Sequence, residues 1–227
     1  MSAELVRVPR AWGTGGEAMA AAASLALPYP DAAVVDADTL AGQSRLLAAV
    51  LPERPLVLGG CCCSHIGAVE GLAARGDRLA LVWFDAHGDL NTPESSPSGN
   101  TWGMPLRLIL DGGAVRPEDV ALVGARNLDP PEVEYLASSP LHTGQDAIEQ
   151  ALAGADAVYV ALDADSAEPG ELACFMPEPN GLRLEELDEL LREVSGRARV
   201  AGLGFSGLLP DPANEPKLAR LAAALGL

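Results

Sequence analysis

Two carboxylates and an imidazole lie within five positions of the chain, at Asp85, His87 and Asp89, directly after the apolar run at residues 79–84. Their alternate spacing aims all three side chains to one side of an extended strand end. An unpaired carboxylate removed from water costs on the order of several kcal/mol, so the group needs a cation or a dense hydrogen-bond network. Oxygen and imidazole together suit Mn, Zn, Fe or Ni better than Ca. A solvated strand end, with Asp89 capping the next turn, explains this motif alone equally well.

Asp163 and Asp165 repeat the arrangement at the end of a second apolar run, residues 157–162. For this pair alone, an Asp-x-Asp turn ahead of Pro169 is the simpler explanation. Two such strand ends in one chain favour a shared metal centre, because each carboxylate pair otherwise has to find its own compensating charge.

The rest of the chain alternates between short apolar runs and helical patterns, which is typical of βαβ units. Nearly continuous apolar runs indicate strands that are covered by helices on both faces. We therefore predict an α/β fold, a three-layer α/β/α sandwich with a mostly parallel central sheet. The expected strands lie within residues 31–38, 55–60, 79–87, 119–126, 157–165 and 199–207, and the expected helices span 17–26, 40–51, 63–75, 130–138, 184–195 and 215–225.

Polar residues at the carboxyl ends of parallel strands are candidates for function, since ligands of open parallel sheets bind there. Four segments meet this criterion: residues 61–65, 85–89, 163–165 and 207–211. We expect them to meet at one edge of the sheet.

Composition narrows the class of protein. The 227 residues contain no linker-like stretch, so we expect a single domain over residues 1–227. A formal net charge of -17, with Lys217 as the only lysine, argues against a nucleic-acid partner. The longest apolar stretch is about half of the ~20 residues that a membrane span needs, and the N-terminus lacks the pattern of a secretory signal. Consecutive cysteines at 61–63 and a distant Cys174 do not suggest disulfides, and reduced thiols fit a cytoplasmic protein.

Three motifs resemble those of the ureohydrolases, the family of arginase, agmatinase and formimidoylglutamase. LGGCCCSHIG (58–67) is similar to the family's LGGDHS, WFDAHGDLNTPESSPSGNTWGMPL (83–106) to its DAHxDxNTP and SGNxHGMPL, and LDADSAEP (162–169) to its DxDxxDP. The matches follow the family's order over about two thirds of the chain. The middle motif is highly specific.

The resemblance implies a binuclear Mn(II) site, with two ions per chain. Asp85 and Asp163 would bridge the ions, and Asp89 and His87 are also assigned to catalysis. Paired ions about 3.5 to 4 Å apart lower the pKa of a shared water and present hydroxide to an electrophilic carbon. By motif position, one ion would be held by Cys62, Asp85, Asp89 and Asp163, and the other by Asp85, His87, Asp163 and Asp165.

The first departure from the family pattern is Cys62, which stands where the family has a histidine ligand, after Cys61 in place of an aspartate. A thiolate is softer than imidazole, so Zn or Fe could replace Mn in this site. Free cysteine is also a common small buried hydrophobe. His65 lies three positions on and could reach the same space, but we interpret it as an ordinary helix-face histidine.

Two further departures affect catalysis. Trp102 replaces the histidine that is thought to carry protons to the leaving amine, and indole is neither acid nor base near neutral pH. In GLGFSGLLPD, aligned with the family's GxDxxExNP, Gly204 replaces the aspartate and Gly207 replaces the glutamate that contacts guanidinium. A cationic guanidinium would lose its charge-assisted anchor. These changes argue against ordinary arginase activity.

The resemblance also implies a binding site for the amino-acid end of a substrate. D-P-P-E is at the same time a good capping box, and residues 98–100 also fit a plain turn. The candidate substrate-binding residues are Asn91, Ser98 and Asn100, which match arginase contacts to the α-carboxylate, Asp129 and Glu132 near the α-amino group, and Trp102.

These features predict a metal-dependent hydrolase of a linear C–N bond in an arginine-like amino acid. A modified guanidine such as N-hydroxyarginine fits, because a less basic leaving nitrogen depends less on the missing proton carrier. One alternative is a deacetylase-like enzyme with a single metal on Asp85, His87 and Asp165, although paired histidines of that type are missing. Another is a metal-binding or regulatory protein without turnover. Family members commonly form trimers or hexamers, so we expect a homo-oligomer.

Overall fold

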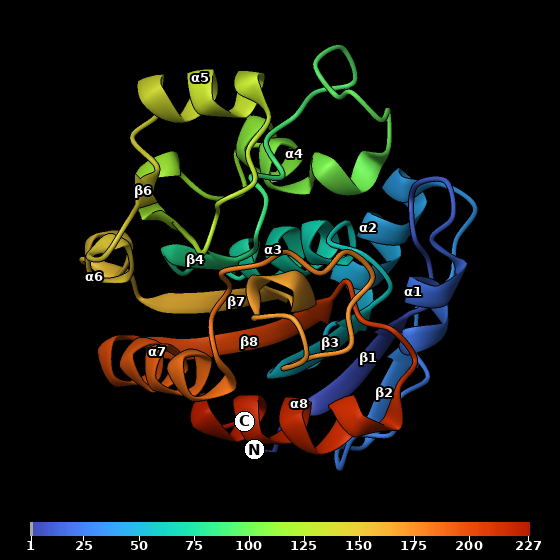
Figure 1. The fold of residues 1–227 in the computed structure, drawn as a ribbon. Coiled ribbons are helices and arrows are strands. Elements are labelled where there is room, and N and C mark those ends of the chain that lie inside the picture. The colour runs from blue at the N-terminus through green and yellow to red at the C-terminus, as the bar shows by residue number, and fades with distance from the viewer. Residues whose placement is uncertain (1) are drawn as a thin grey trace.

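A computed structural model describes residues 2–227, which form one eight-stranded parallel sheet in the order β2-β1-β3-β8-β7-β4-β5-β6 (Figure 1). The strands are β1 (Glu4–Val8), β2 (Asp31–Val34), β3 (Pro55–Gly59), β4 (Leu79–Phe84), β5 (Val120–Val123), β6 (His142–Thr143), β7 (Ala157–Asp163) and β8 (Arg199–Ser206). The helices are α1 (Glu17–Ala22), α2 (Leu40–Val50), α3 (Ser64–Ala73), α4 (Pro105–Asp111), α5 (Pro130–Ser138), α6 (Ala147–Leu152), α7 (Leu184–Arg197) and α8 (Glu215–Ala224). The predicted fold class is confirmed.

Two apolar cores lie on opposite faces of the sheet. Successive strand residues alternate between them, as the pleat requires: Leu56 and Leu58 belong to one core and Val57 to the other. The first core packs under α6, α7 and α8, and the second under α2, α3 and α4, so that the sheet is the middle layer (Figure 1). The central strands are buried on both faces, which explains why their sequences are almost wholly apolar.

Each predicted strand and helix overlaps an observed element, but two strands and two helices were not predicted. In β1, the charged residues Glu4 and Arg7 interrupt the apolar pattern, and the strand forms because it pairs with both β2 and β3. β6 has only two residues, too few for a sequence pattern. α4 begins at Pro105, within the 83–106 motif, for which no helix was predicted. α6 follows β6 and packs against β5.

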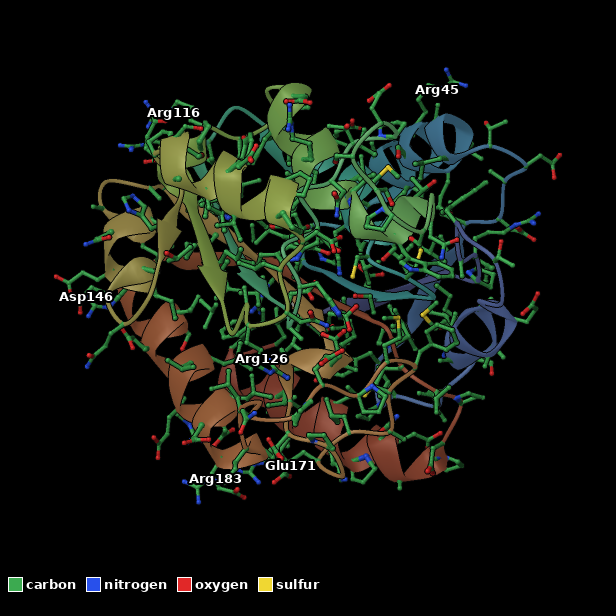
Figure 2. All side chains as sticks on the ribbon, turned by 45° about the horizontal axis from the view of Figure 1, so that its top comes forward. Arg45, Arg116, Arg126, Asp146, Glu171 and Arg183 are labelled. Atoms are coloured by element: carbon green, nitrogen blue, oxygen red, sulfur yellow. The ribbon has the colours of Figure 1, made fainter. Side chains whose placement is uncertain are left out.

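Charged side chains lie mainly at the periphery. Figure 2 shows Arg45, Arg116, Asp146 and Arg183 pointing outward from the rim, and all four are exposed. Among residues 2–227, no helix has the length and apolar character that a membrane crossing requires.

Candidate metal centre

The carboxyl ends of four adjacent strands, β3, β8, β7 and β4, bring the chemically active residues together. Cys62 follows β3, and its Sγ lies 2.7 Å from Asp163 Oδ2 at the end of β7 and 3.9 Å from Asp85 Oδ2 after β4. Cys62 and Asp163 are 101 positions apart in the sequence. The convergence of these strand ends was predicted and is what the structure shows.

The predicted ligands form two groups that share one residue. Cys62, Asp85 and Asp89 offer ligand atoms within 4.8 Å of one another, and so do Asp85, His87 and Asp165. A carboxylate common to two groups is the arrangement that a pair of bridged cations requires. Asp163 belongs to neither group of three, but it contacts the first through Cys62.

Backbone and indole N–H groups hold the carboxylates of this centre in fixed orientations. Asp85 accepts hydrogen bonds from Trp83 Nε1 at 3.0 Å and from the backbone N–H of His87 at 2.7 Å. Asp165 accepts from the backbone N–H of Ala86 at 3.0 Å. Trp83 lies in β4, whereas the backbone donors of Ala86 and His87 lie in the DAHGD segment that follows it, so β4 and this segment together orient Asp85 and Asp165.

Asp89 has an unusual backbone conformation and an unpartnered oxygen. Its φ of 52° lies in the left-handed region, which costs a non-glycine residue about 1–2 kcal/mol. Its Oδ2 is buried and accepts no hydrogen bond from the residues that the structure describes. A buried carboxylate oxygen without a donor needs another source of positive charge. The residues at this centre therefore fit a bound cation.

The electrostatics of the centre also favour a cation. Burial raises the pKa of Asp85, Asp89 and Asp165, and burial together with the charge of Asp165 raises the pKa of Asp163 to about 7. Burial likewise raises the pKa of the Cys62 thiol well above its usual range. Burial opposes a charge on His87, but its hydrogen bonds to Asp165 and Asp85 prevail and raise its pKa to about 12. A bound cation would reverse these shifts, because it stabilises the ionised carboxylates and thiolate and competes with the proton of the His87 imidazole.

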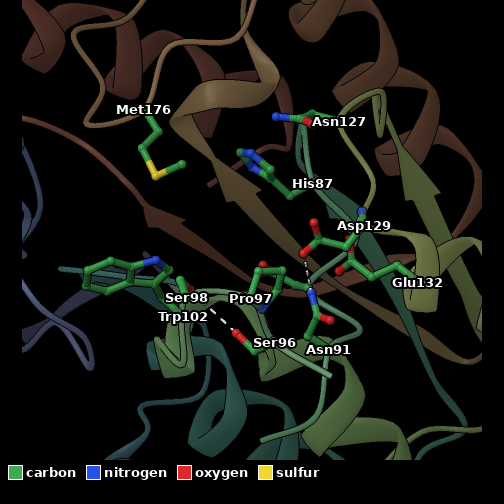
Figure 3. A pocket seen from close by; sticks show the side chains of 12 residues that line it. His87, Asn91, Ser96, Pro97, Ser98, Trp102, Asn127, Asp129, Glu132 and Met176 are labelled. Carbon is green, nitrogen blue, oxygen red and sulfur yellow. Dashed lines mark hydrogen bonds between the residues drawn. The ribbon is translucent and has the colours of Figure 1, made fainter. Parts of the chain in front are cut away.

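A cavity of about 260 Å³ opens beside this centre (Figure 3). Its size suits a small molecule. Figure 3 shows Trp102 and Met176 on one side and Asp129 and Glu132 on the other. The lining residues are His87, Asp89, Asn91, Ser96, Pro97, Ser98, Trp102, Gly103, Asn127, Asp129, Glu132 and Met176.

The carboxylates of Asp129 and Glu132 line the cavity and cap α5 at the same time. Glu132 Oε2 accepts from the backbone N–H of Asp129 at 2.9 Å, as a capping box requires. Its other oxygen accepts from the backbone N–H of Leu90 at 2.9 Å, and Asn91 Nδ2 donates to Asp129 Oδ2 at 2.8 Å. Both interpretations of the D-P-P-E segment therefore agree with the geometry.

One predicted substrate residue lies outside the cavity. Asn100 is not among the lining residues, and its side-chain oxygen accepts from the backbone N–H of Thr14 at 2.9 Å. Trp102 does line the cavity, and its indole packs edge-on against Phe175, with ring centroids 5.9 Å apart. A β-carbon at Gly13 would lie 2.3 Å from that indole, so the ring is tightly held.

The structure has no room for the two carboxylates that the family has at positions 204 and 207. Gly207 has a φ of 68°, and a β-carbon there would lie 2.2 Å from Asp163 Oδ1. A β-carbon at Gly204 would lie 2.2 Å from the Tyr159 hydroxyl oxygen. The Asp163 carboxylate therefore occupies the space that a side chain at position 207 would need, and Tyr159 and His65 occupy the space next to Gly204.

His65 lies on α3 and joins neither ligand group, as predicted, but its side chain is in the core and has hydrogen-bond partners on β7 and β8. It is fully buried, with Nδ1 3.0 Å from the Tyr159 hydroxyl and Nε2 3.1 Å from Ser206 Oγ. Burial lowers its pKa to about 3. Since both ring nitrogens have partners, His65 lies next to the metal centre without joining either ligand group.

Several residues that support the centre were not predicted from the sequence. Ser206 is the last residue of β8, one position before the segment selected as a strand end. Trp83 alternates with Asp85, so the period of the strand could have found it. No local signal marks Arg126, whose guanidinium donates to the backbone carbonyls of Gly124, Asp165, Glu178 and Pro179 and ties the 177–180 loop to the site.

The structure is a parallel α/β sandwich with two candidate metal-ligand groups, which share one carboxylate, at the carboxyl ends of its strands. The chain belongs to the arginase family, whose model matches residues 22–227. The family resemblance seen in the motifs is confirmed.

Individual relatives agree with this assignment. The chain is 37% identical to the arginase of Bacillus subtilis (strain 168) over 162 residues, which cover 58% of this chain and 55% of that protein. It is 31% identical to the arginase of Bacillus caldovelox over 198 residues, covering 75% and 66%. In these sequence matches the chain spans about half the length of the first relatives.

Solved structures share the fold. The crystal structure of arginase from Bacillus subtilis has a TM-score of 0.86 at 24% identity and covers 99% of this chain and 98% of that chain. Formimidoylglutamase from the same species has a TM-score of 0.78 at 17% identity, with 100% and 88% covered.

Proposed function

We propose that the chain is a metal-dependent hydrolase that cleaves a linear C–N bond in a guanidino or amidino compound. One observation carries the proposal: Asp85 belongs to two groups of candidate ligands, and Asp89, which has an unpartnered buried oxygen, belongs to one of them. Family membership supports the same reaction class.

The predicted ligands would hold two cations. When bound, these cations would polarise water and the guanidino or amidino group that contains the scissile C–N bond. Mn(II) is the expected metal. The thiol of Cys62 supports Zn or Fe in the first position, since sulfur ligands favour softer metals. The first set would be Cys62, Asp85, Asp89 and Asp163, and the second Asp85, His87, Asp163 and Asp165.

The residues of the cavity would select a substrate with a cationic amine distant from the metals. Asp129 presents a carboxylate there and is oriented by Asn91. Trp102 lines the opposite side of the cavity and carries no titratable proton. Gly207 offers no acceptor to a guanidinium group. The substrate should therefore be a guanidine of lower basicity, such as an arginine-like N-hydroxyguanidine, because it depends less on a charge-assisted anchor; its hydrolysis gives hydroxyurea and the alkylamine.

The test is a metal-content measurement combined with a substrate panel. Purified protein, stripped of metal and reloaded with Mn, Zn or Fe, should bind two ions per chain and release hydroxyurea from N-hydroxyarginine faster than urea from arginine. Asp85→Asn is the matched control and should do neither. Two bound ions with no turnover on any guanidine or amidine would overturn the enzymatic proposal.

A single-metal centre is the second candidate, because Asp85, His87 and Asp165 form a complete group by themselves. One Zn per chain with deacetylation of an acylamine would support it. The homo-oligomer, a trimer or hexamer, stays a prediction that light scattering can check.

A further inference from the structure

A hydrogen-bonded series of buried polar side chains lies next to the proposed metal centre. Tyr159 on β7, His65 on α3 and Ser206 on β8 are each fully buried. The Tyr159 hydroxyl lies 3.0 Å from His65 Nδ1, His65 Nε2 lies 3.1 Å from Ser206 Oγ, and Ser206 Oγ lies 3.1 Å from Asp163 Oδ2. None of these three residues belongs to the ligand groups.

The chemistry of these groups fixes the direction of each hydrogen bond. An ionised Asp163 only accepts, so Ser206 donates its single hydroxyl proton to Asp163. Ser206 then accepts from His65, whose proton is on Nε2. His65 Nδ1 is therefore the acceptor for the Tyr159 hydroxyl proton. The donors run in one direction, from Tyr159 through His65 and Ser206 to Asp163.

Aromatic packing keeps the imidazole in place. The His65 ring is edge-on to Trp83, with centroids 5.2 Å apart, and to Tyr159, with centroids 5.9 Å apart. Trp83 also donates from Nε1 to Asp85 Oδ2 at 3.0 Å. The same buried layer therefore supports both carboxylates that are predicted to bridge the cations.

Gly204 makes the space for this arrangement. A β-carbon at position 204 would lie 2.2 Å from the Tyr159 hydroxyl oxygen and 2.6 Å from His65 Cε1. The aspartate that the family has at this position is thus incompatible with His65 and Tyr159 as they pack here. The absence of a side chain at Gly204 therefore leaves the space that His65 and Tyr159 occupy.

We propose that Tyr159, His65 and Ser206 are positioning residues that orient Asp163, and through its contact the Cys62 thiol, toward bound cations. The inference rests on the proposed function, because it takes Asp163 and Cys62 as metal ligands. Outer hydrogen bonds fix the orientation of a metal ligand, and their loss typically lowers metal affinity by about 10- to 100-fold.

Co(II) binding to the metal-free full chain tests the proposal. The affinity comes from the titration, and the near-ultraviolet thiolate-to-Co(II) absorption reports on Cys62. Ser206→Ala should weaken Co(II) binding by about 10- to 100-fold and change this band, and Ser206→Thr should restore both. Ser64→Ala is the control, since it removes a buried hydroxyl of the same helix as His65 that has no partner among the described residues. It should leave both readouts unchanged.

The outcomes separate this inference from the proposed function. Wild type that binds no Co(II), Mn(II) or Zn(II) would overturn both. If the wild type binds Co(II), and Ser206→Ala binds it as tightly as Ser64→Ala does, only the positioning role would be overturned. If Ser206→Ala does not fold, Tyr159→Phe tests the positioning role instead, because it removes only the Tyr159 hydroxyl, the first donor of the hydrogen-bonded series. It should weaken binding in the same direction, and unchanged affinity would contradict the proposal.

Discussion

Cys62 Sγ lies 2.7 Å from Asp163 Oδ2, although the two residues are 101 positions apart in the sequence. Both groups are buried, and burial raises the pKa of each. They cannot both be ionised at this distance unless a cation lies near them. This contact is the reason to treat the thiol as a metal ligand, and it leads to the first prediction.

Cys62→His should change the metal preference of the protein. Imidazole is a harder ligand than thiolate, so we expect the ratio of Mn to Zn affinities to rise by about tenfold or more. Competitive loading followed by elemental analysis measures this ratio. Cys174→Ser, which alters a buried thiol outside both ligand groups, should leave the ratio as in wild type. An unchanged ratio in Cys62→His would show that Cys62 is a core residue.

Substitution of single carboxylates should remove a defined number of metal ions. Asp85→Asn should lose both, because Asp85 belongs to both ligand groups. Asp89→Asn should lose only the ion on the Cys62 side, and Asp165→Asn only the other. Metal content per chain after exhaustive loading gives the count. If Asp85→Asn kept two ions, the shared-ligand arrangement would be incorrect.

Trp102→His should raise turnover of unmodified arginine by about 100-fold, at the lower end of what a positioned proton carrier contributes. The side chain lines the cavity, as the family's histidine position implies. Trp102→Phe is the control, because it keeps an aromatic ring against Phe175 but carries no titratable proton. Steady-state rates of urea release compare the two. Equal rates in both variants would rule out a missing proton carrier as the cause of low activity.

Gly207→Glu should fail to restore a guanidinium anchor. The backbone φ of 68° is unfavourable for any side chain by about 1–2 kcal/mol, and the new β-carbon would overlap the Asp163 carboxylate. We expect lower thermal stability and lower metal content, and the same for Gly207→Ala, which adds only the β-carbon. Thermal unfolding and elemental analysis test this. A folded Gly207→Glu with two metals and faster arginine cleavage would contradict it.

His65 should make folding sensitive to acid. Burial lowers its pKa to about 3, whereas the unfolded chain takes up this proton below about 6.5. The unfolded state therefore binds more protons between these values, so stability falls with acidification by up to about 1.4 kcal/mol per pH unit. Raised carboxyl pKa values, such as that of Asp163, act in the opposite direction, so the test needs a matched variant.

His65→Gln provides that comparison, because it keeps the same carboxylates. Between pH 6.5 and 5 the metal-free wild type should lose about 2 kcal/mol more unfolding free energy than this variant. Urea denaturation at the two pH values measures the difference. Parallel losses in the two proteins would mean that His65 titrates normally in the folded state.

The sequence by itself determined the fold class, most of the strands and helices, the family and the set of residues that meet at the sheet edge. These depend on local patterns: apolar runs such as 157–162 can only be central strands, and parallel strands place their carboxyl ends on one side. Asp85 and Asp163 could therefore be brought together without coordinates.

Only the tertiary structure decided what surrounds those residues. Asn100 fits its motif, yet its side chain bonds Thr14 outside the cavity. The sequence shows His65 only as a histidine on a helix face, yet its side chain is buried in the space that Gly204 leaves free. Such outcomes depend on which atoms of distant segments compete for the same volume. Close packing between elements sets that competition, and no period or spacing along the chain records it.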